Sequence, residues 1–169
     1  MISLGIDPGT IRTGWGVVRR DGSRIVRIDS GVIHLDEHTA IEDRLVVLHD
    51  RLNEILLSTG PDEAAVENLF FAKNASSALK LGHARGVILL CLRRHGLPVA
   101  SYQPTEVKRA LIGAGRAEKG QIQRVLEIIL KTGRALEADE ADALAVAVCH
   151  ANGAGLRRPG NPLSHSHER

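Results

Sequence analysis

The stretch ISLGIDPGTIRTGWGVV, from Ile2 to Val18, decides the fold of this chain. Its apolar start predicts a short strand that ends at Asp7. Pro8 favours extended backbone geometry at Asp7, and Gly9 permits a tight turn. The chain then returns through Gly14–Val18, which predicts a second strand antiparallel to the first. Asp7 would stand at the end of a central strand, where a buried acid is costly unless something pairs with it. A turn aspartate that caps its own loop is the simpler alternative.

The hydrophobic pattern after this stretch predicts a mixed α/β domain. Asp21-Gly22 signals a hairpin turn into a third strand that runs from Ile25 to Leu35. Apolar residues three and four positions apart predict a helix from Ile41 to Leu56. Further on we expect strands at 64–67 and 98–102, and helices that begin at Ser77, Pro104, Ile122 and Asp139. Three hairpin strands followed by alternating helices and strands predict an α/β fold with a mixed central sheet flanked by helices.

Length and composition predict one domain with a sizeable core, since the chain has 169 residues and 43% of them are apolar. We expect this domain to span 1–152 and the tail 153–169, which has no periodicity, to be disordered. No continuous apolar run is long enough to span a bilayer and no leader precedes the first strand, so we expect a cytoplasmic protein. Cys91 and Cys149 lie in apolar helical patterns without paired spacing, which predicts buried, reduced thiols.

The net charge of +2 hides an uneven distribution of charge along the chain. The segment 36–67 holds nine acids and two arginines, whereas 68–95 holds five basic residues and no acid. The segment 103–134 holds seven basic residues and three acids. Charge separated in this way favours a face that binds a polyanion. Ordinary solvated helices are the alternative.

Acids from three parts of the chain share one kind of setting. Asp7 ends the first predicted strand and Glu67 ends the fourth, while Asp139 and Asp142 lie three positions apart on one face of the last helix. A favourable helix dipole accounts for Asp139 but poorly for Asp142, which lies where the sequence turns small and apolar. Clustered carboxylates need a cation, and oxygen ligands select Mg²⁺ or Mn²⁺. Two such ions per site can hydrolyse a phosphodiester.

Four segments of the chain resemble the characteristic blocks of RuvC-type Holliday-junction resolvases. In order, they are LGIDPGTIRTGWGV, AVENLFFAKNASSALKLGHARG, VKRALIGAGRAEKGQI and ADEADALAVA. The resemblance runs from Ile2 to about His150 and implies a ribonuclease-H-like fold. It implies a homodimeric, metal-dependent endonuclease that resolves four-way DNA junctions in recombination and repair by paired nicks in opposing strands. It also implies a bacterial, nucleoid-associated protein and a branch-migration motor complex as a partner.

The same resemblance assigns roles to individual residues. It places the catalytic and metal-binding acids at Asp7, Glu67, Asp139 and Asp142, and related enzymes can differ at the position of Asp139. It places Phe70 on the DNA, where an aromatic ring can unstack bases, and leaves Phe71 for packing or a dimer contact. Both rings could instead fill the core. The basic residues expected to contact DNA are Lys73, Lys80, Arg85, Lys108, Arg116 and Lys119.

Other classes of protein share parts of this pattern. The opening motif resembles the phosphate hairpin of actin-like ATPases and sugar kinases. Those enzymes need a second lobe with another phosphate loop, which 169 residues do not provide. A junction-binding protein without activity would have no use for the four acids. A small related nuclease family that processes ribosomal RNA shares the opening motif, but the FFAKN and GAGRAEKGQ blocks favour the junction enzyme.

Overall fold

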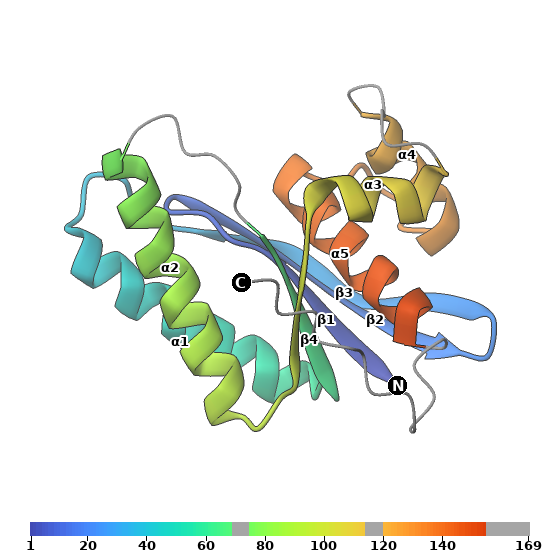
Figure 1. Cartoon of the computed structure of the whole chain (residues 1–169), viewed down its shortest axis with the longest axis horizontal. Helices are drawn as coiled ribbons and strands as arrows, with labels where there is room; N and C mark the ends of the chain where they lie inside the picture. Colours follow the sequence, from blue (N-terminus) through green and yellow to red (C-terminus); the bar gives the residue numbers. More distant parts are fainter. Residues whose placement is uncertain (69–74, 114–119, 155–169) are drawn as a thin grey trace, which may run out of the picture.

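The computed structural model describes residues 1–68, 75–113 and 120–154, which form a five-stranded sheet with helices on both faces (Figure 1). The strands are β1 (Ile2–Asp7), β2 (Arg12–Asp21), β3 (Arg24–His34), β4 (Glu63–Glu67) and β5 (Val99–Tyr102). The spatial order of the strands is β3-β2-β1-β4-β5. β1, β2 and β3 form an antiparallel meander, while β4 runs parallel to both β1 and β5. The predicted mixed sheet is therefore confirmed.

Five helices complete the described part of the fold. They are α1 (Ile41–Thr59), α2 (Ala75–Arg94), α3 (Pro104–Ile112), α4 (Gln121–Leu130) and α5 (Ala138–Ala154). Three boundaries differ from expectation. Ser77 lies inside α2 rather than at its cap. α4 closes at Lys131, which adopts the left-handed conformation with φ of 49°, and not at Thr132-Gly133. α5 continues two residues past Asn152, and the tail from residue 155 lies outside the described residues.

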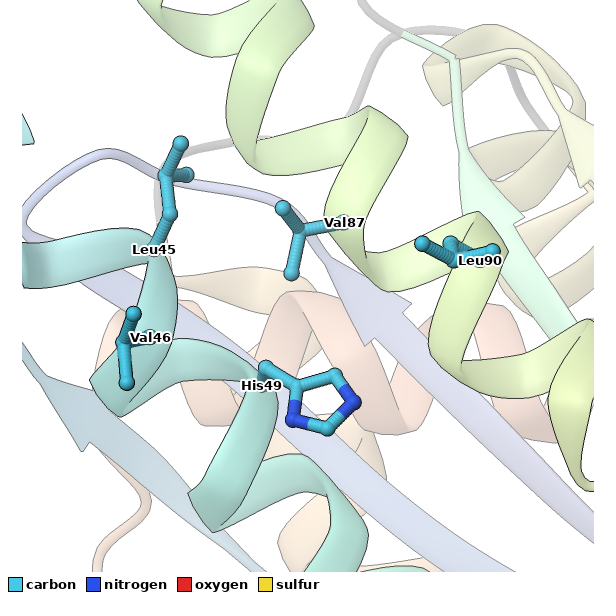
Figure 2. Close-up of a pocket in the computed structure, with 5 residues that line it drawn as sticks. All are labelled: Leu45, Val46, His49, Val87 and Leu90. Atoms are coloured by element: carbon cyan, nitrogen blue, oxygen red, sulfur yellow. The ribbon is translucent and has the colours of Figure 1, made fainter. Parts of the chain in front are cut away.

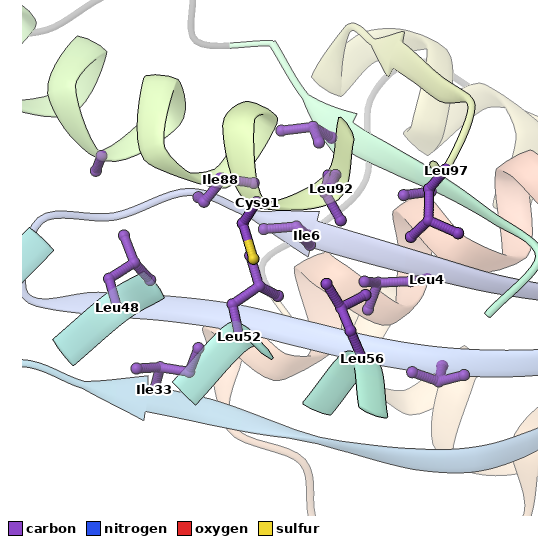
Figure 3. Packing of buried hydrophobic residues seen from close by; sticks show 14 of the residues in the cluster. Leu4, Ile6, Ile33, Leu48, Leu52, Leu56, Ile88, Cys91, Leu92 and Leu97 are labelled. Atoms are coloured by element: carbon purple, nitrogen blue, oxygen red, sulfur yellow. The ribbon is translucent and has the colours of Figure 1, made fainter. Parts of the chain in front are cut away.

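The two faces of the sheet carry different helices and separate cores. α1 and α2 cover one face, while α3, α4 and α5 cover the other (Figure 1). Leu4 and Ile6 of β1 point toward α1 and α2 and are fully buried there (Figure 3). Gly5, between them, faces α5, because successive strand residues point to opposite faces. A Cβ on Gly5 would lie 2.2 Å from the Ala143 carbonyl oxygen, so α5 rests directly on the backbone of β1.

Both cysteines are buried and free, as predicted. Cys91 packs among the leucines between α1, α2 and the sheet, and burial raises the pKa of its thiol (Figure 3). Cys149 lies on α5 in the core on the opposite face, where burial likewise raises its pKa. Thiols of this kind stay protonated at neutral pH and act as small apolar groups.

The helix α2 corrects the expectation that no apolar segment reaches membrane-spanning length. By length and composition alone it could cross a bilayer, with a mean hydropathy of 1.2, and only 22% of that stretch is buried inside the structure. A single helix of this kind is weak evidence for a membrane, because core helices of soluble proteins also meet the test. The exposed apolar surface includes Leu79, 63% exposed, and Leu90, 58% exposed.

Candidate active site

The strands β1 and β4 deliver two acids to one point. β4 runs parallel to β1, with Ile6 opposite Val66, so Asp7 and Glu67 leave the carboxyl ends of neighbouring strands side by side. Because side chains alternate along a strand, Asp7 lies on the same face as Gly5, toward α5. Glu67 shares a face with Ala65, which packs in the core beneath α5. Both acids therefore point into the space covered by the start of α5.

The first turns of α5 bring the other two acids to the same place. A Cβ on Gly14 of β2 would lie 1.8 Å from the Asp139 carbonyl oxygen, so the helix begins in direct contact with the sheet. Gly14 is also the pairing partner of Asp7 in the β1–β2 ladder. Asp142 follows Asp139 by three positions and faces the same way. The charge of Asp139 acts on both Asp7 and Asp142, which places all three carboxylates in one cluster.

Burial and mutual repulsion shift the protonation of this cluster. Burial raises the pKa of Asp7 to about 9, together with the charges of Glu67, Asp142 and Asp139 and a hydrogen bond to Glu67. Burial also raises the pKa of Glu67 and of Asp142, and nearby acids add to both shifts. Like charges held in a poorly solvated place favour the protonated form. The structure thus concentrates acids that a cation would have to neutralise.

Lys108 on α3 is a basic residue whose charge acts on two acids of this cluster. Its half-buried ammonium opposes the pKa increases of both Glu67 and Asp142. The capping box formed by Gln103 and Glu106 fixes the start of α3. Lys108 therefore approaches the cluster from a helix whose first turn is anchored at the end of β5.

The side chains of the four acids have the chemistry that a hard cation needs, but they do not have the arrangement of a complete metal site. The donor set consists of carboxylate oxygens, three of them on half-buried side chains and one, Asp142, on an exposed residue, and Mg²⁺ and Mn²⁺ prefer such oxygens. Across 1–68, 75–113 and 120–154, however, no three His, Cys, Asp or Glu side chains have the arrangement of a complete metal site. Asp7 bonds to Glu67, and Asp139 bonds to Arg12. The acids are close enough to repel one another, and the bond between Asp7 and Glu67 must open before both can bind a cation.

The remaining predicted DNA contacts divide into two groups. Lys80 is exposed on α2. Arg85 donates hydrogen bonds of 3.1 Å to Asn68 Oδ1 and to Ser101 Oγ, and so ties α2 to the ends of β4 and β5. The residues whose predicted roles lie outside the described residues are Phe70, Phe71, Lys73, Arg116 and Lys119.

Sequence reasoning missed the partners of two acids on α5. Glu140 is 1% exposed, accepts hydrogen bonds from Ser30 and Arg134, and forms an ion pair with Arg134. Burial alone would raise the pKa of Glu140, but these hydrogen bonds outweigh burial and lower it. Arg12 binds Asp139 in the same region. Nothing local in the sequence marked Glu140, which lies between Asp139 and Asp142, or the arginines that bind these acids.

Comparison with known proteins identifies the family. The family model described as crossover junction endodeoxyribonuclease RuvC matches residues 3–150 of the chain. The chain belongs to the RuvC family. It is 49% identical to the RuvC of Sorangium cellulosum over 153 residues, covering 90% of this chain and 86% of that protein. It is 46% identical to the RuvC of Petrotoga mobilis, covering 90% of this chain and 94% of that protein.

Solved structures agree with the sequence comparison. RuvC of Thermus thermophilus in complex with a Holliday junction substrate superimposes with a TM-score of 0.87 at 34% identity, over 92% of this chain and 96% of that one. The yeast mitochondrial Holliday junction resolvase Ydc2 has a TM-score of 0.64 at 16% identity, over 88% and 77% of the two chains, and supports the fold alone. The predicted RuvC resemblance and ribonuclease-H-like fold are confirmed, and RuvC enzymes are metal-dependent endonucleases.

Proposed function

We propose that this RuvC-family chain resolves four-way DNA junctions by hydrolysing one phosphodiester in each of two opposing strands. The observation that carries the mechanism is the gathering of Asp7, Glu67, Asp139 and Asp142 at the carboxyl ends of β1 and β4. Acids brought from three separate segments to one place repel one another and are costly to the fold unless the site uses them. The expected products are a 5′-phosphate and a 3′-hydroxyl, which a ligase can rejoin.

The four acids would hold the catalytic cations. Mg²⁺ or Mn²⁺, two per site, would supply an activated water and stabilise the leaving oxygen. Asp7 and Glu67 sit on strand ends, so their backbones are fixed by the sheet ladder and their positions are set before DNA arrives. Asp142 and Asp139 close the site from α5. Asp7 must give up its proton to act as a ligand, since burial and its acidic neighbours raise its pKa to about 9.

Lys108 would favour the ionised form of the site and contact the DNA backbone. Its charge already opposes the pKa increases of Glu67 and Asp142, so it helps keep these ligands deprotonated. An ammonium is a compact point charge that suits a phosphate oxygen. We place Lys119 and Phe70 in the same DNA-binding surface on the basis of the family resemblance.

A cleavage assay tests this function. A synthetic mobile four-way junction is incubated with the protein in EDTA, in Mg²⁺ and in Mn²⁺, beside a linear duplex of the same sequence. We expect paired nicks in the junction alone, only with the divalent ion, and their loss in Asp7→Asn. Cutting that survives chelation, or Asp7→Asn cutting at the rate of the original protein, contradicts the proposed mechanism.

We further propose a homodimer formed through α1 and α2. Leu45, Val46, His49, Val87 and Leu90 line an almost wholly apolar hollow of about 240 Å³ between these helices (Figure 2). Val46 is 59% exposed and Leu90 is 58% exposed. A junction has approximate two-fold symmetry, and a two-fold dimer presents one site to each of two opposing strands. A second copy packed on this surface would cover the apolar residues.

Further partners and location follow from the family alone. We propose that the chain acts in the bacterial cytoplasm, at the nucleoid through its DNA substrate, together with a branch-migration motor complex. Co-sedimentation with such a motor on junction DNA, compared with protein lacking DNA, would test the association.

A further inference from the structure

One guanidinium group holds two acids at the start of α5. Arg12, the first residue of β2, donates from Nε to Asp139 Oδ2 at 2.6 Å and from Nη2 to Glu137 Oε2 at 2.5 Å. Glu137 lies just before α5 and Asp139 in its first turn. The contact spans 127 residues of sequence and joins the strand that follows the Asp7 turn to the helix that carries Asp142. Among the described residues, no other basic side chain contacts an acid of the cluster as closely as Arg12 does.

Stability alone is a poor explanation for this contact. The Arg12, Asp139 and Glu137 side chains are 42%, 30% and 50% exposed, and ion pairs at such positions contribute little to folding. The close packing of Gly14 against Asp139 already fixes the helix on the sheet. Arg12 instead fixes the orientation of the two carboxylates, because a planar guanidinium that binds both at once restricts the rotation of each.

We infer that Arg12 is a positioning residue that orients Asp139 for cation binding, an inference that rests on the proposed metal-dependent function. Arg12 occupies Oδ2 of Asp139, so Oδ1 remains to share a cation with Asp142, which lies three positions along the same helix face. Partners that hydrogen-bond to a ligating carboxylate typically change metal affinity or activity by about 10–100-fold when removed. Glu137 binds Nη2 of the same guanidinium and so holds Arg12 at the edge of the site when Asp139 turns toward a cation.

A double-mutant cycle read by metal binding tests this role without relying on cleavage. Mn²⁺ is titrated calorimetrically into the full chain, without DNA, for the original protein, Arg12→Gln, Asp139→Asn and the double variant. We expect Arg12→Gln to weaken Mn²⁺ binding by about tenfold, and the double variant to bind no more weakly than Asp139→Asn. Arg12→Lys should recover part of the loss, since one ammonium can hold Asp139 but cannot bind both acids in a fork.

The matched control is Arg19→Gln on the same strand, where Arg19 pairs with Asp21 at 3.1 Å. It should bind Mn²⁺ like the original protein, and the melting temperatures of both arginine variants should agree. Mn²⁺ affinity that is unchanged or increased in Arg12→Gln overturns the inference, as do losses that add in the double variant. Retained junction cutting by Asp7→Asn would instead overturn the proposed function, so the two failures are distinguishable.

Discussion

Gly14 of β2 lies directly against the Asp139 carbonyl oxygen of α5, with room for a hydrogen atom and no more, since a Cβ would come within 1.8 Å. We therefore predict that Gly14→Ala lowers the free energy of unfolding by about 3 kcal/mol, because backbone and not a flexible side chain would have to move. Denaturant unfolding measures the loss. The control is Gly82→Ala on α2, where an added Cβ meets nothing within 4 Å and helix propensity should raise stability. Equal stability of the two variants would contradict the close packing.

Removing the Asp7 charge should stabilise the protein without divalent ions. The folded-state pKa of Asp7 is about 9, above its ordinary 3.8, so the fold favours the protonated form. Its contribution is fully present below pH 3.8 and is lost as pH rises toward 9. At pH 8 in EDTA, we expect Asp7→Asn to raise the free energy of unfolding by ~2 kcal/mol. This is less than the full pKa shift would give at ~1.4 kcal/mol per unit, because Glu67 shares the proton. The control, Asp21→Asn at the exposed end of β2, should change little. A lower melting temperature in Asp7→Asn would refute this reasoning.

Cation binding should release protons and strengthen with pH. Asp7 has a pKa of about 9 and must lose its proton to bind a cation, and the pKa values of Glu67 and Asp142 are raised in the same direction. We expect Mn²⁺ affinity to increase between pH 6 and pH 9. Titration calorimetry in two buffers of different ionisation enthalpy at one pH gives the number of protons released. Binding heats that do not depend on the buffer would show that the acids are already ionised.

Neutralising Lys108 should affect both the acids and the DNA. Loss of its charge removes the effect that opposes the raised pKa of Glu67 and of Asp142, so Mn²⁺ binding in Lys108→Gln should require a higher pH. A lost phosphate contact would also reduce the slope of log K against log salt by about 0.9 on a junction. Arg24→Gln, at the far end of β3, is the control for charge alone. If the salt slope of DNA binding and the pH dependence of Mn²⁺ binding matched those of the control, Lys108 would not be part of the site.

A charge on the apolar surface of α2 should separate the dimer. Leu90→Asp places a carboxylate at a hollow lined by apolar side chains of α1 and α2, so its burial against a second copy would be costly. We expect a monomer at micromolar concentration in sedimentation velocity, and single nicks in place of paired ones. Ile128→Asp on α4, a position that is 75% exposed on the other face, is the matched control and should remain dimeric. If Leu90→Asp remained a dimer, the surface of α1 and α2 would not be the dimer interface.

The sequence predicts the features of this fold that depend on local patterns. Alternation in β1 and the turn at Pro8-Gly9 place Asp7 at a strand end, and the short apolar run before Glu67 does the same for β4. The three-residue spacing of Asp139 and Asp142 fixes their common face on α5. These patterns suffice for the acids, because strand ends and helix faces are properties of neighbouring residues.

Contacts between distant residues could not be predicted in this way. Arg12 and Asp139 are 127 positions apart, and Ser30 and Glu140 are 110 positions apart. Arg85 was predicted to contact DNA because it lies in a basic segment of the chain, yet its guanidinium binds Asn68 and Ser101. Such pairs come together because of two long-range features of the fold. One is the register of β2 against β1, and the other is the close packing of α5 on the glycine backbone of the sheet.

The order in which the four acids occur along the chain has a consequence for synthesis. Asp7 and Glu67 emerge early from the ribosome, while Asp139 and Asp142 arrive on the final described helix. The four proposed ligands are therefore present together only after α5 has been made. Under the proposed mechanism, a truncated product that lacks α5 would lack two of the four metal-binding acids and would not cut DNA.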